Sequence, residues 1–293
     1  MNIEHRLVYK DTIHINHMKR RLNTTLSPIA WKILTKYEEQ YGNKNDVIER
    51  ALKGFDKTHY LTRLGIKDFR VTINRMSMGE PGMDSLLEGG IPRGFLVVLT
   101  GPPGTGKTTL SLQFLIEGCK GGERGIYFSF EEDADQIARH GFRFGWNLKE
   151  YFEQGLLELF GMARMSFEQI IAILEDYKPQ RVVFDSMNMV VNPTEFRKGP
   201  AWKEFLKTLK EADTVCLMVT EKTQHYDNFE FDEFDFMGDG IVFLDRVPGE
   251  SEKFLLSIEK MRMTKSKNLP IPFRFGKNGI VSFPGEQVFT KER

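Results

Sequence analysis

The sequence has few cysteines and no long apolar segment. Its 293 residues include only two cysteines, Cys119 and Cys216, too few for a disulfide-stabilised scaffold or a cysteine-based zinc cluster. No apolar run approaches the roughly 18–20 residues that a membrane-spanning helix requires. Residues 1–10 carry mixed charges and lack the apolar stretch of a secretory signal. These absences predict a cytoplasmic protein that does not interact with a membrane.

The chain also lacks a net charge, because 41 Lys and Arg residues balance 41 Asp and Glu residues. The balance is uneven along the sequence. Residues 1–70 contain 14 Lys and Arg against 8 Asp and Glu, whereas the rest of the chain contains 27 against 33. A basic segment joined to a mildly acidic one indicates that the two parts have different partners.

Short apolar runs alternate with helix-length segments after residue 73. The runs predict buried strands over residues 95–100, 126–130, 181–184, 214–220 and 240–244, with helices over 107–118 and 166–177 between them. Such alternation is typical of an α/β fold in which helices flank both faces of a mainly parallel sheet. Further strands are expected over 253–260 and 279–283.

A phosphate-binding motif follows the first of these strands. Residues 101–108 read GPPGTGKT and fit the pattern G-x-x-x-x-G-K-[ST]. The glycines allow consecutive backbone N–H groups to face a phosphate at a helix N-terminus. Lys107 is expected to reach the β- and γ-phosphates, and the Thr108 hydroxyl to bind Mg²⁺. The residues predicted to bind ATP are Gly101, Pro102, Pro103, Gly104, Thr105, Gly106, Lys107, Thr108 and Thr109.

Acidic residues at two strand ends complete the predicted site. Asp185 ends the apolar run Val-Val-Phe-Asp and is expected to hold Mg²⁺ with Thr108. Glu131 and Glu132 follow the strand over 126–130, where a carboxylate can orient and polarise the attacking water. The alternative for these two glutamates is a solvated acidic turn.

Several motifs resemble the KaiC-like branch of the RecA-type ATPases. They read GMDSLLEGGIPRG at residues 82–94, YFSFEE at 127–132, GWNL at 145–148, VFDS at 183–186, DGIV at 239–242 and KMR at 260–262. The resemblance covers residues 73–284 and leaves a tail over 285–293. It implies a RecA-type ATPase domain in which Glu131 is the catalytic glutamate, Glu132 supports it, and Thr220 and Glu221 lie at the sensor end of the central strand.

The same resemblance implies that Lys260 and Arg262 act in trans, each reaching the γ-phosphate bound by a neighbouring subunit. A cation supplied in this way stabilises the charge of the phosphoryl-transfer transition state. The resemblance therefore predicts a homo-oligomer, specifically a hexameric ring. This chain departs from the family pattern after Arg262. The family often has Gly directly after this Arg, where this chain has Met263, and a His soon afterwards, where this chain has Ser266 and Lys267. The chain has a single ATPase domain, so autophosphorylation and timekeeping are not inferred from the tandem clock protein.

The basic segment predicts a small separate domain over residues 19–57, after a flexible arm over 1–18 and before a linker over 58–72. Residues 19–26 alternate like a strand, Ser27-Pro28 starts a helix, and Gly42 ends it before a second helix. This order resembles the ribbon–helix–helix domains of the MetJ/Arc class, in which paired strands enter the major groove of duplex DNA. The predicted DNA contacts are Arg21, Asn23 and Thr25 to bases and Asn43, Lys44 and Asn45 to phosphate. The alternative is a dimerisation module with no DNA target.

An acidic, phenylalanine-rich loop over residues 227–236 follows the predicted sensor residues. No Lys or Arg occurs from residue 224 to residue 244, so the loop is expected to repel phosphates and either to face a protein or to pack within the ring. We therefore expect an oligomeric regulatory or signalling ATPase tethered to DNA. The alternatives are a nucleotide-binding scaffold with negligible turnover and, disfavoured by this loop, a recombination or repair ATPase acting on single strands. How dimeric N-terminal domains fit a ring is left open.

Overall fold

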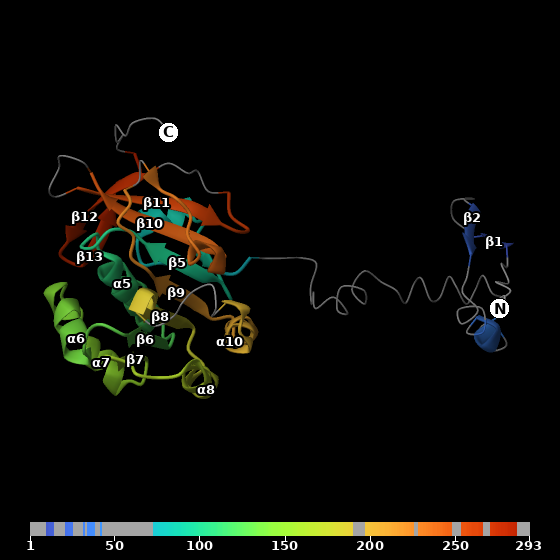
Figure 1. Ribbon diagram of the computed structural model, residues 1–293, viewed down its shortest axis with the longest axis horizontal. Coiled ribbons are helices and arrows are strands. Elements are labelled where there is room, and N and C mark those ends of the chain that lie inside the picture. Colours follow the sequence, from blue (N-terminus) through green and yellow to red (C-terminus); the bar gives the residue numbers. More distant parts are fainter. Residues whose placement is uncertain are drawn as a thin grey trace. The chain divides into compact units, whose positions relative to one another are not determined.

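The computed structural model divides the chain into two compact units, Met1–Thr72 and Ile73–Arg293 (Figure 1). In the second unit the structure describes residues 73–189, 197–225, 228–247, 253–265 and 270–285. In the first unit it describes residues 10–14, 21–25, 32, 34–38 and 42.

A nine-stranded sheet forms the centre of the second unit, in the order β13-β12-β11-β10-β5-β9-β8-β6-β7. Six neighbouring strands are parallel, and three antiparallel strands extend the sheet beyond β10. The parallel strands are β5 (Leu96–Thr100), β6 (Gly125–Ser129), β7 (Leu157–Phe160), β8 (Arg181–Asp185), β9 (Val215–Val219) and β10 (Gly240–Arg246). The antiparallel strands are β11 (Phe254–Met261), β12 (Ile271–Gly276) and β13 (Gly279–Ser282). The predicted mainly parallel sheet is confirmed.

Two strands of this sheet were not predicted. β7 is a short edge strand with only Leu157 fully buried, so it lacks the continuous apolar run that marks the central strands. β12 contains Pro272, a residue that argues against a strand because it has no N–H for the ladder. The sheet accommodates it in the antiparallel extension, where Pro272 lies opposite Leu255.

Helices cover both faces of the sheet (Figure 1). On one face lie α5 (Lys107–Lys120), α6 (Ala134–Arg143) and α7 (Leu148–Glu153), and on the other α8 (Phe167–Tyr177) and α10 (Pro200–Glu211). A short helix, α4 (Pro81–Leu86), and a two-stranded pair, β3 (Arg75–Met76) with β4 (Ile91–Pro92), precede β5. Among the residues that the structure describes, no helix is long and apolar enough to span a bilayer.

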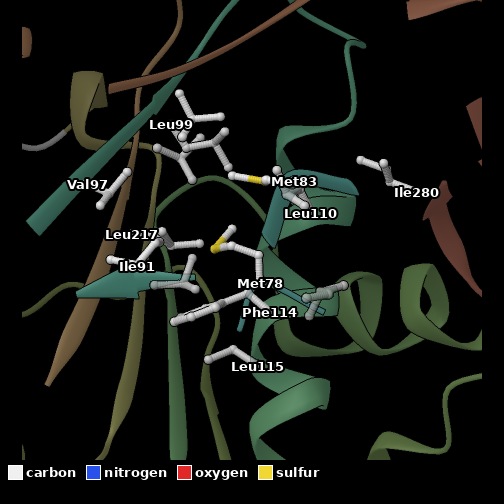
Figure 2. Close-up of a cluster of buried hydrophobic side chains, with 14 of the residues drawn as sticks. Met78, Met83, Ile91, Val97, Leu99, Leu110, Phe114, Leu115, Leu217 and Ile280 are labelled. Atoms are coloured by element: carbon white, nitrogen blue, oxygen red, sulfur yellow. The ribbon is translucent and has the colours of Figure 1, made fainter. Parts of the chain in front are cut away.

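Alternate residues of the central strands supply the two cores. Val97 and Leu99 of β5 pack with Phe114 of α5, whereas Leu96 and Val98 belong to the cluster under α8 and α10. Figure 2 shows the first of these clusters, in which Met78 and Met83 from the segment before β5 also point toward the sheet. A strand presents successive side chains to opposite faces, so a strand covered on both sides must be apolar throughout.

The C-terminal hairpin β12–β13 is held over α5 by one buried glutamine. Gln113 Oε1 accepts the backbone N–H of Ile280 at 2.7 Å, and Gln113 Nε2 donates to the carbonyl of Gly79 at 2.6 Å. These bonds join the last strand of the sheet to the helix that follows the phosphate-binding motif. They bring Phe275 of β12 close to Gly106.

In the first unit, β1 (Lys10–His14) pairs antiparallel with β2 (Arg21–Thr25). The arm expected over residues 1–18 therefore contains a strand, and β2 pairs within its own chain. Thr12 and Ile13 are β-branched, which favours a strand even though the segment is too short to show periodicity.

Residues 34–38 are helical, and Gly42, predicted to end this helix, is not helical itself. Gly42 has a φ of 99°, and its N–H donates to the carbonyl of Glu38 at 3.0 Å. Asn43, Lys44 and Asn45 lie outside the described residues. Arg21, Asn23 and Thr25 lie on β2, at register positions opposite His14, Thr12 and Lys10.

Candidate nucleotide site

The phosphate-binding motif lies at the carboxyl edge of the parallel strands, between β5 and α5. Its close packing requires glycine at two positions. Gly101 has a φ of 143°, and a Cβ there would lie 2.0 Å from the carbonyl oxygen of Leu244. Gly106 has a φ of 98°, and a Cβ there would lie 2.7 Å from Cζ of Phe275. Any larger residue would therefore distort the loop that presents the N–H groups.

Lys107 is buried at the start of α5, and its ammonium group points back into the loop. Lys107 Nζ donates to the carbonyls of Gly101 at 2.9 Å and Pro102 at 3.0 Å, and lies 3.7 Å from Oε1 of Glu221. Burial lowers the pKa of Lys107, although the charges of Glu221 and Asp185 oppose this shift. The cation is thus held beside the backbone groups expected to bind phosphate.

The two predicted metal ligands are in direct contact. Thr108 Oγ1 donates to Oδ2 of Asp185 at 3.0 Å, and the Tyr127 hydroxyl donates to the same oxygen. Burial raises the pKa of Asp185, against the lowering effect of these hydrogen bonds. A hydroxyl and a carboxylate are hard oxygen ligands, and Mg²⁺ normally takes few protein ligands together with water and phosphate oxygens. The donor set therefore fits Mg²⁺.

Glu131 and Glu132 lie beside this pair. Ser186, the residue after Asp185, donates through Oγ to Oε1 of Glu131 at 2.5 Å. Burial raises the pKa of Glu132, and the charges of Asp185 and Glu131 raise it further. The two glutamates therefore differ within the described residues: a hydroxyl binds the carboxylate of Glu131, whereas Glu132 is bonded through its backbone N–H, which donates to Oγ of Ser129 at 2.9 Å.

A cavity of about 410 Å³ brings these groups together. It is lined by six of the predicted functional side chains, Lys107, Thr108, Thr109, Glu131, Glu132 and Asp185, and by Glu221. Ser129 also lines the cavity and was not predicted as a site residue. Four other lining residues were not predicted either: His140, Arg143, Phe144 and Phe275. They form a largely aromatic wall, in which the rings of Phe144 and Phe275 lie 6.2 Å apart and Nε2 of His140 lies 2.9 Å from the Thr109 hydroxyl. Three of them, His140, Arg143 and Phe144, shortly precede the motif at residues 145–148 in the sequence. No sequence signal indicates that Phe275 lines this cavity.

Lys260 and Arg262 are not part of this cavity. The strand register shows where they lie. Met261, between them, is opposite Gly240, and Gly240 pairs with Val97 near the start of β5. The end of β5, at Thr100, pairs with Phe243 instead. The pair thus lies near the amino edge of the parallel strands, roughly 10 Å along the strands from the phosphate-binding edge. Lys260 Nζ donates to the carbonyl of Gly238 at 2.8 Å, and Arg262 donates to Oδ1 of Asp239 at 2.7 Å.

The acidic, phenylalanine-rich loop is anchored by Lys222. This buried ammonium group contacts Asp235, lies 3.1 Å from Asp232 and donates to the carbonyl of Glu230 at 2.8 Å. Of the loop's phenylalanines, Phe229 and Phe234 pack into the apolar cluster beneath α8 and α10, whereas Phe231 and Phe236 are exposed. Only half of the aromatic rings are therefore available to a partner.

Comparison with known proteins gives the family. The KaiC ATPase family model matches residues 76–287, and a second model, described as a family N-terminal domain, matches residues 26–59. The second description does not specify a ribbon–helix–helix, so that assignment stays a prediction.

Three relatives illustrate the similarity. A UPF0273 protein of Methanopyrus kandleri is 34% identical over 76% of this chain and 97% of its own length. The circadian clock oscillator protein KaiC of Parasynechococcus marenigrum is 31% identical over 73% of this chain but only 46% of its own length. The crystal structure of a KaiC-like protein from Pyrococcus horikoshii superposes with a TM-score of 0.60 and 29% identity, over 72% of this chain and all of that one. The chain belongs to the KaiC ATPase family.

Proposed function

We propose that the protein is an oligomeric, Mg²⁺-dependent ATPase. The observation that carries the proposal is the convergence of Lys107, the Thr108–Asp185 pair and Glu131 on one cavity. Phosphoryl transfer needs little covalent chemistry from the protein, so a cation, a metal site and a water-orienting carboxylate in fixed positions are its main requirements.

Each group has a role that its surroundings support. Mg²⁺ neutralises charge on the β- and γ-phosphates when bound. Thr108 and Asp185 would hold it, and Lys107 would turn from the loop carbonyls to the phosphates. Glu131, oriented by Ser186, would position the attacking water. The aromatic wall of Phe144 and Phe275 would exclude water from the bound nucleotide.

Replacing Glu131 by Gln tests the catalytic assignment. The substitution keeps the shape and removes the base, so phosphate release should fall by roughly 10²–10⁴-fold while nucleotide affinity changes little. Steady-state phosphate release and a binding titration measure the two quantities. Glu204→Gln, an exposed change on α10, is the matched control. Unchanged turnover in Glu131→Gln would favour the scaffold with negligible hydrolysis.

The position of Lys260 and Arg262 supports a shared active site. They lie near the edge opposite the phosphate-binding motif of their own unit, which is consistent with a role at the site of another copy. We assign them to the γ-phosphate of the neighbouring subunit in a ring, expected to be hexameric. A guanidinium supplied in trans can contribute 10³–10⁵ to turnover in other phosphoryl-transfer systems.

Mixed assemblies test this assignment. Arg262→Ala subunits and Lys107→Ala subunits should each be inactive alone. When mixed, the interface between an intact Lys107 and an intact Arg262 regains a complete site, so turnover should rise above that of either variant. Verified co-assembly without recovery would contradict the trans assignment.

We further propose that the N-terminal unit tethers the ATPase to duplex DNA, with β2 presenting Arg21, Asn23 and Thr25 to base edges. Support comes from the six-charge basic surplus of residues 1–70, beside an acidic ATPase unit. ATP-dependent assembly would link several DNA-binding units, and the resulting avidity would couple nucleotide to DNA occupancy. The acidic loop anchored by Lys222 is proposed to face a protein partner or a neighbouring subunit.

A further inference from the structure

The turn that carries Arg262 adopts an unfavourable backbone conformation. Met263, directly after Arg262, has a φ of 57°, and its side chain is largely exposed. A residue with a Cβ is disfavoured in this left-handed region, where glycine is readily accommodated. The side chain of Met263 buries little surface in return, so other contacts must hold the turn in place.

Those contacts come from Arg75 on β3, 188 residues away in the sequence. Its Nη2 donates to the carbonyl of Met263 at 2.7 Å, and its Nη1 donates to the hydroxyl of Thr264 at 2.8 Å. The same guanidinium is fixed from the other side by the carbonyl of Gly90 at 3.1 Å and by Glu88 at 2.9 Å. Only 10% of the Arg75 side chain is exposed, so this is an anchored group rather than a solvated surface arginine.

The Arg262 turn is therefore held from two sides, by Asp239, whose carbonyl also accepts the Arg262 N–H at 3.1 Å, and by Arg75. Asp239 binds the guanidinium of Arg262, and Arg75 binds the backbone immediately after it. The first contact can be exchanged when Arg262 engages a phosphate. The second involves no atom of Arg262, so it can persist throughout that exchange and keep the base of the side chain in position.

We infer that Arg75 is a positioning residue for Arg262, fixing the Arg262 turn so that the guanidinium reaches the phosphate site of the neighbouring subunit. This inference rests on the proposed function in trans. A displacement of about 1 Å in a catalytic group can cost on the order of 10²-fold in rate. Arg75 is the third residue after the boundary between the two units. Its side chain therefore connects the start of the ATPase unit to the Arg262 turn.

The first test separates turnover from binding. Arg75→Ala should lower kcat by roughly ten- to a hundredfold, while the KM for ATP stays within about twofold, because the phosphate-binding loop is untouched. Thr264→Val removes one acceptor of the Arg75 guanidinium and should give a smaller loss in kcat. Lys207→Ala, at an exposed ion pair on α10, is the matched control and should leave both constants unchanged. An unaltered kcat in assembled Arg75→Ala rings overturns the inference.

A rescue experiment distinguishes positioning from a general effect on folding. Glycine adopts the left-handed conformation without the penalty that Met263 incurs. Adding Met263→Gly to Arg75→Ala should therefore restore most of the lost kcat, whereas Met263→Gly alone should change it little. A double variant no faster than Arg75→Ala would show that the turn is not what Arg75 supports.

Mixed rings locate the defect on one side of the interface. Arg75→Ala mixed with Lys107→Ala should regain activity, because the Lys107→Ala subunits supply an intact Arg262 turn. Arg75→Ala mixed with Arg262→Ala should not, because both variants damage the same side. The inference about Arg75 alone would be overturned if the mixture of Arg262→Ala and Lys107→Ala regains activity while the mixture of Arg75→Ala and Lys107→Ala does not. Failure of both mixtures would instead refute the trans site.

Discussion

At the residue scale, the groups expected to act in catalysis are each held by hydrogen bonds from neighbouring side chains or to backbone carbonyls. Ser186 binds Glu131, Tyr127 binds Asp185, and carbonyls of the loop bind Lys107. A carboxylate free to rotate would spend little time in the orientation that positions a water molecule. If Glu131 is the catalytic glutamate, we expect the Ser186 hydroxyl to contribute by orienting that carboxylate rather than by touching substrate.

Ser186→Ala should lower kcat by about tenfold, with the KM for ATP nearly unchanged, because it frees the Glu131 carboxylate without altering the phosphate-binding loop. Steady-state phosphate release at varied ATP concentration measures both constants. In the Glu131→Gln background the same change should have almost no further effect, since the two residues act as a unit. Additive losses would show that Ser186 acts independently of Glu131.

At the scale of elements, distant segments are joined through one cluster of charges around the buried Arg181. Arg181 of β8 binds Glu123 from the loop before β6 at 2.7 Å, and Arg93 from the loop before β5 binds the other oxygen of Glu123 at 2.5 Å. Arg181 also donates to the carbonyls of Ser77 and Phe114, each at 2.7 Å. The cluster thus ties the segment containing β3 to α5 and to the centre of the sheet.

This cluster predicts a pH-dependent stability. Burial alone would raise the pKa of Glu123, but the hydrogen bonds and charges of Arg181 and Arg93 outweigh it and hold the pKa below the ordinary value. A carboxyl with a lowered pKa in the folded state stabilises the protein above its unfolded pKa, and this contribution is lost as the pH falls through the folded pKa. Glu123→Gln should therefore cost about 1–3 kcal/mol of unfolding free energy at pH 7.

The difference between Glu123→Gln and the native protein should shrink as the pH falls below about 4. Urea unfolding at intervals from pH 7 to pH 3.5 measures it. Glu153→Gln, which alters an exposed ion pair on α7, should show a much smaller effect at every pH. A difference for Glu123→Gln that does not vary with pH would contradict the assigned cause.

At the scale of the whole molecule, a net charge of zero results from two units of opposite sign. A protein can therefore bind a polyanion with one unit while the other repels it. The acidic loop around Lys222 adds to the negative charge of the ATPase unit, because its exposed rings, Phe231 and Phe236, are interspersed with Asp and Glu residues in the sequence. This arrangement favours duplex binding at the N-terminal unit over threading of a single strand past the ATPase unit.

Binding of the full chain to duplex DNA should therefore weaken about tenfold or more between 50 and 200 mM salt, because phosphate contacts release counterions. Arg21→Ala combined with Asn23→Ala should abolish sequence preference, at a cost of about 1–3 kcal/mol for each lost base contact. Fluorescence anisotropy with duplex and single strands, with and without ATP, measures both effects. Stronger binding to single strands that also stimulates hydrolysis would favour a recombination or repair ATPase.

The sequence by itself determined the parts of the protein that depend on local chemistry. Glycines and a lysine at fixed spacing specify a phosphate loop, and continuous apolar runs specify strands buried on both faces. Asp185 and Glu131 were predicted because parallel strands deliver their carboxyl ends to one edge. Gly42 was predicted because a left-handed residue ends a helix most readily when it is glycine.

Only the tertiary structure decided which distant residues meet. Phe275 reaches the nucleotide cavity because Gln113 holds the C-terminal hairpin on α5, and the strand at Lys10–His14 is defined by its pairing with β2. The separation of Lys260 and Arg262 from their own phosphate loop follows from strand register, and the support of their turn follows from Arg75. Local propensity acts over a few residues. Most of these contacts join segments more than a hundred residues apart, and the others depend on how separate segments pack together, so a short stretch of sequence cannot predict them.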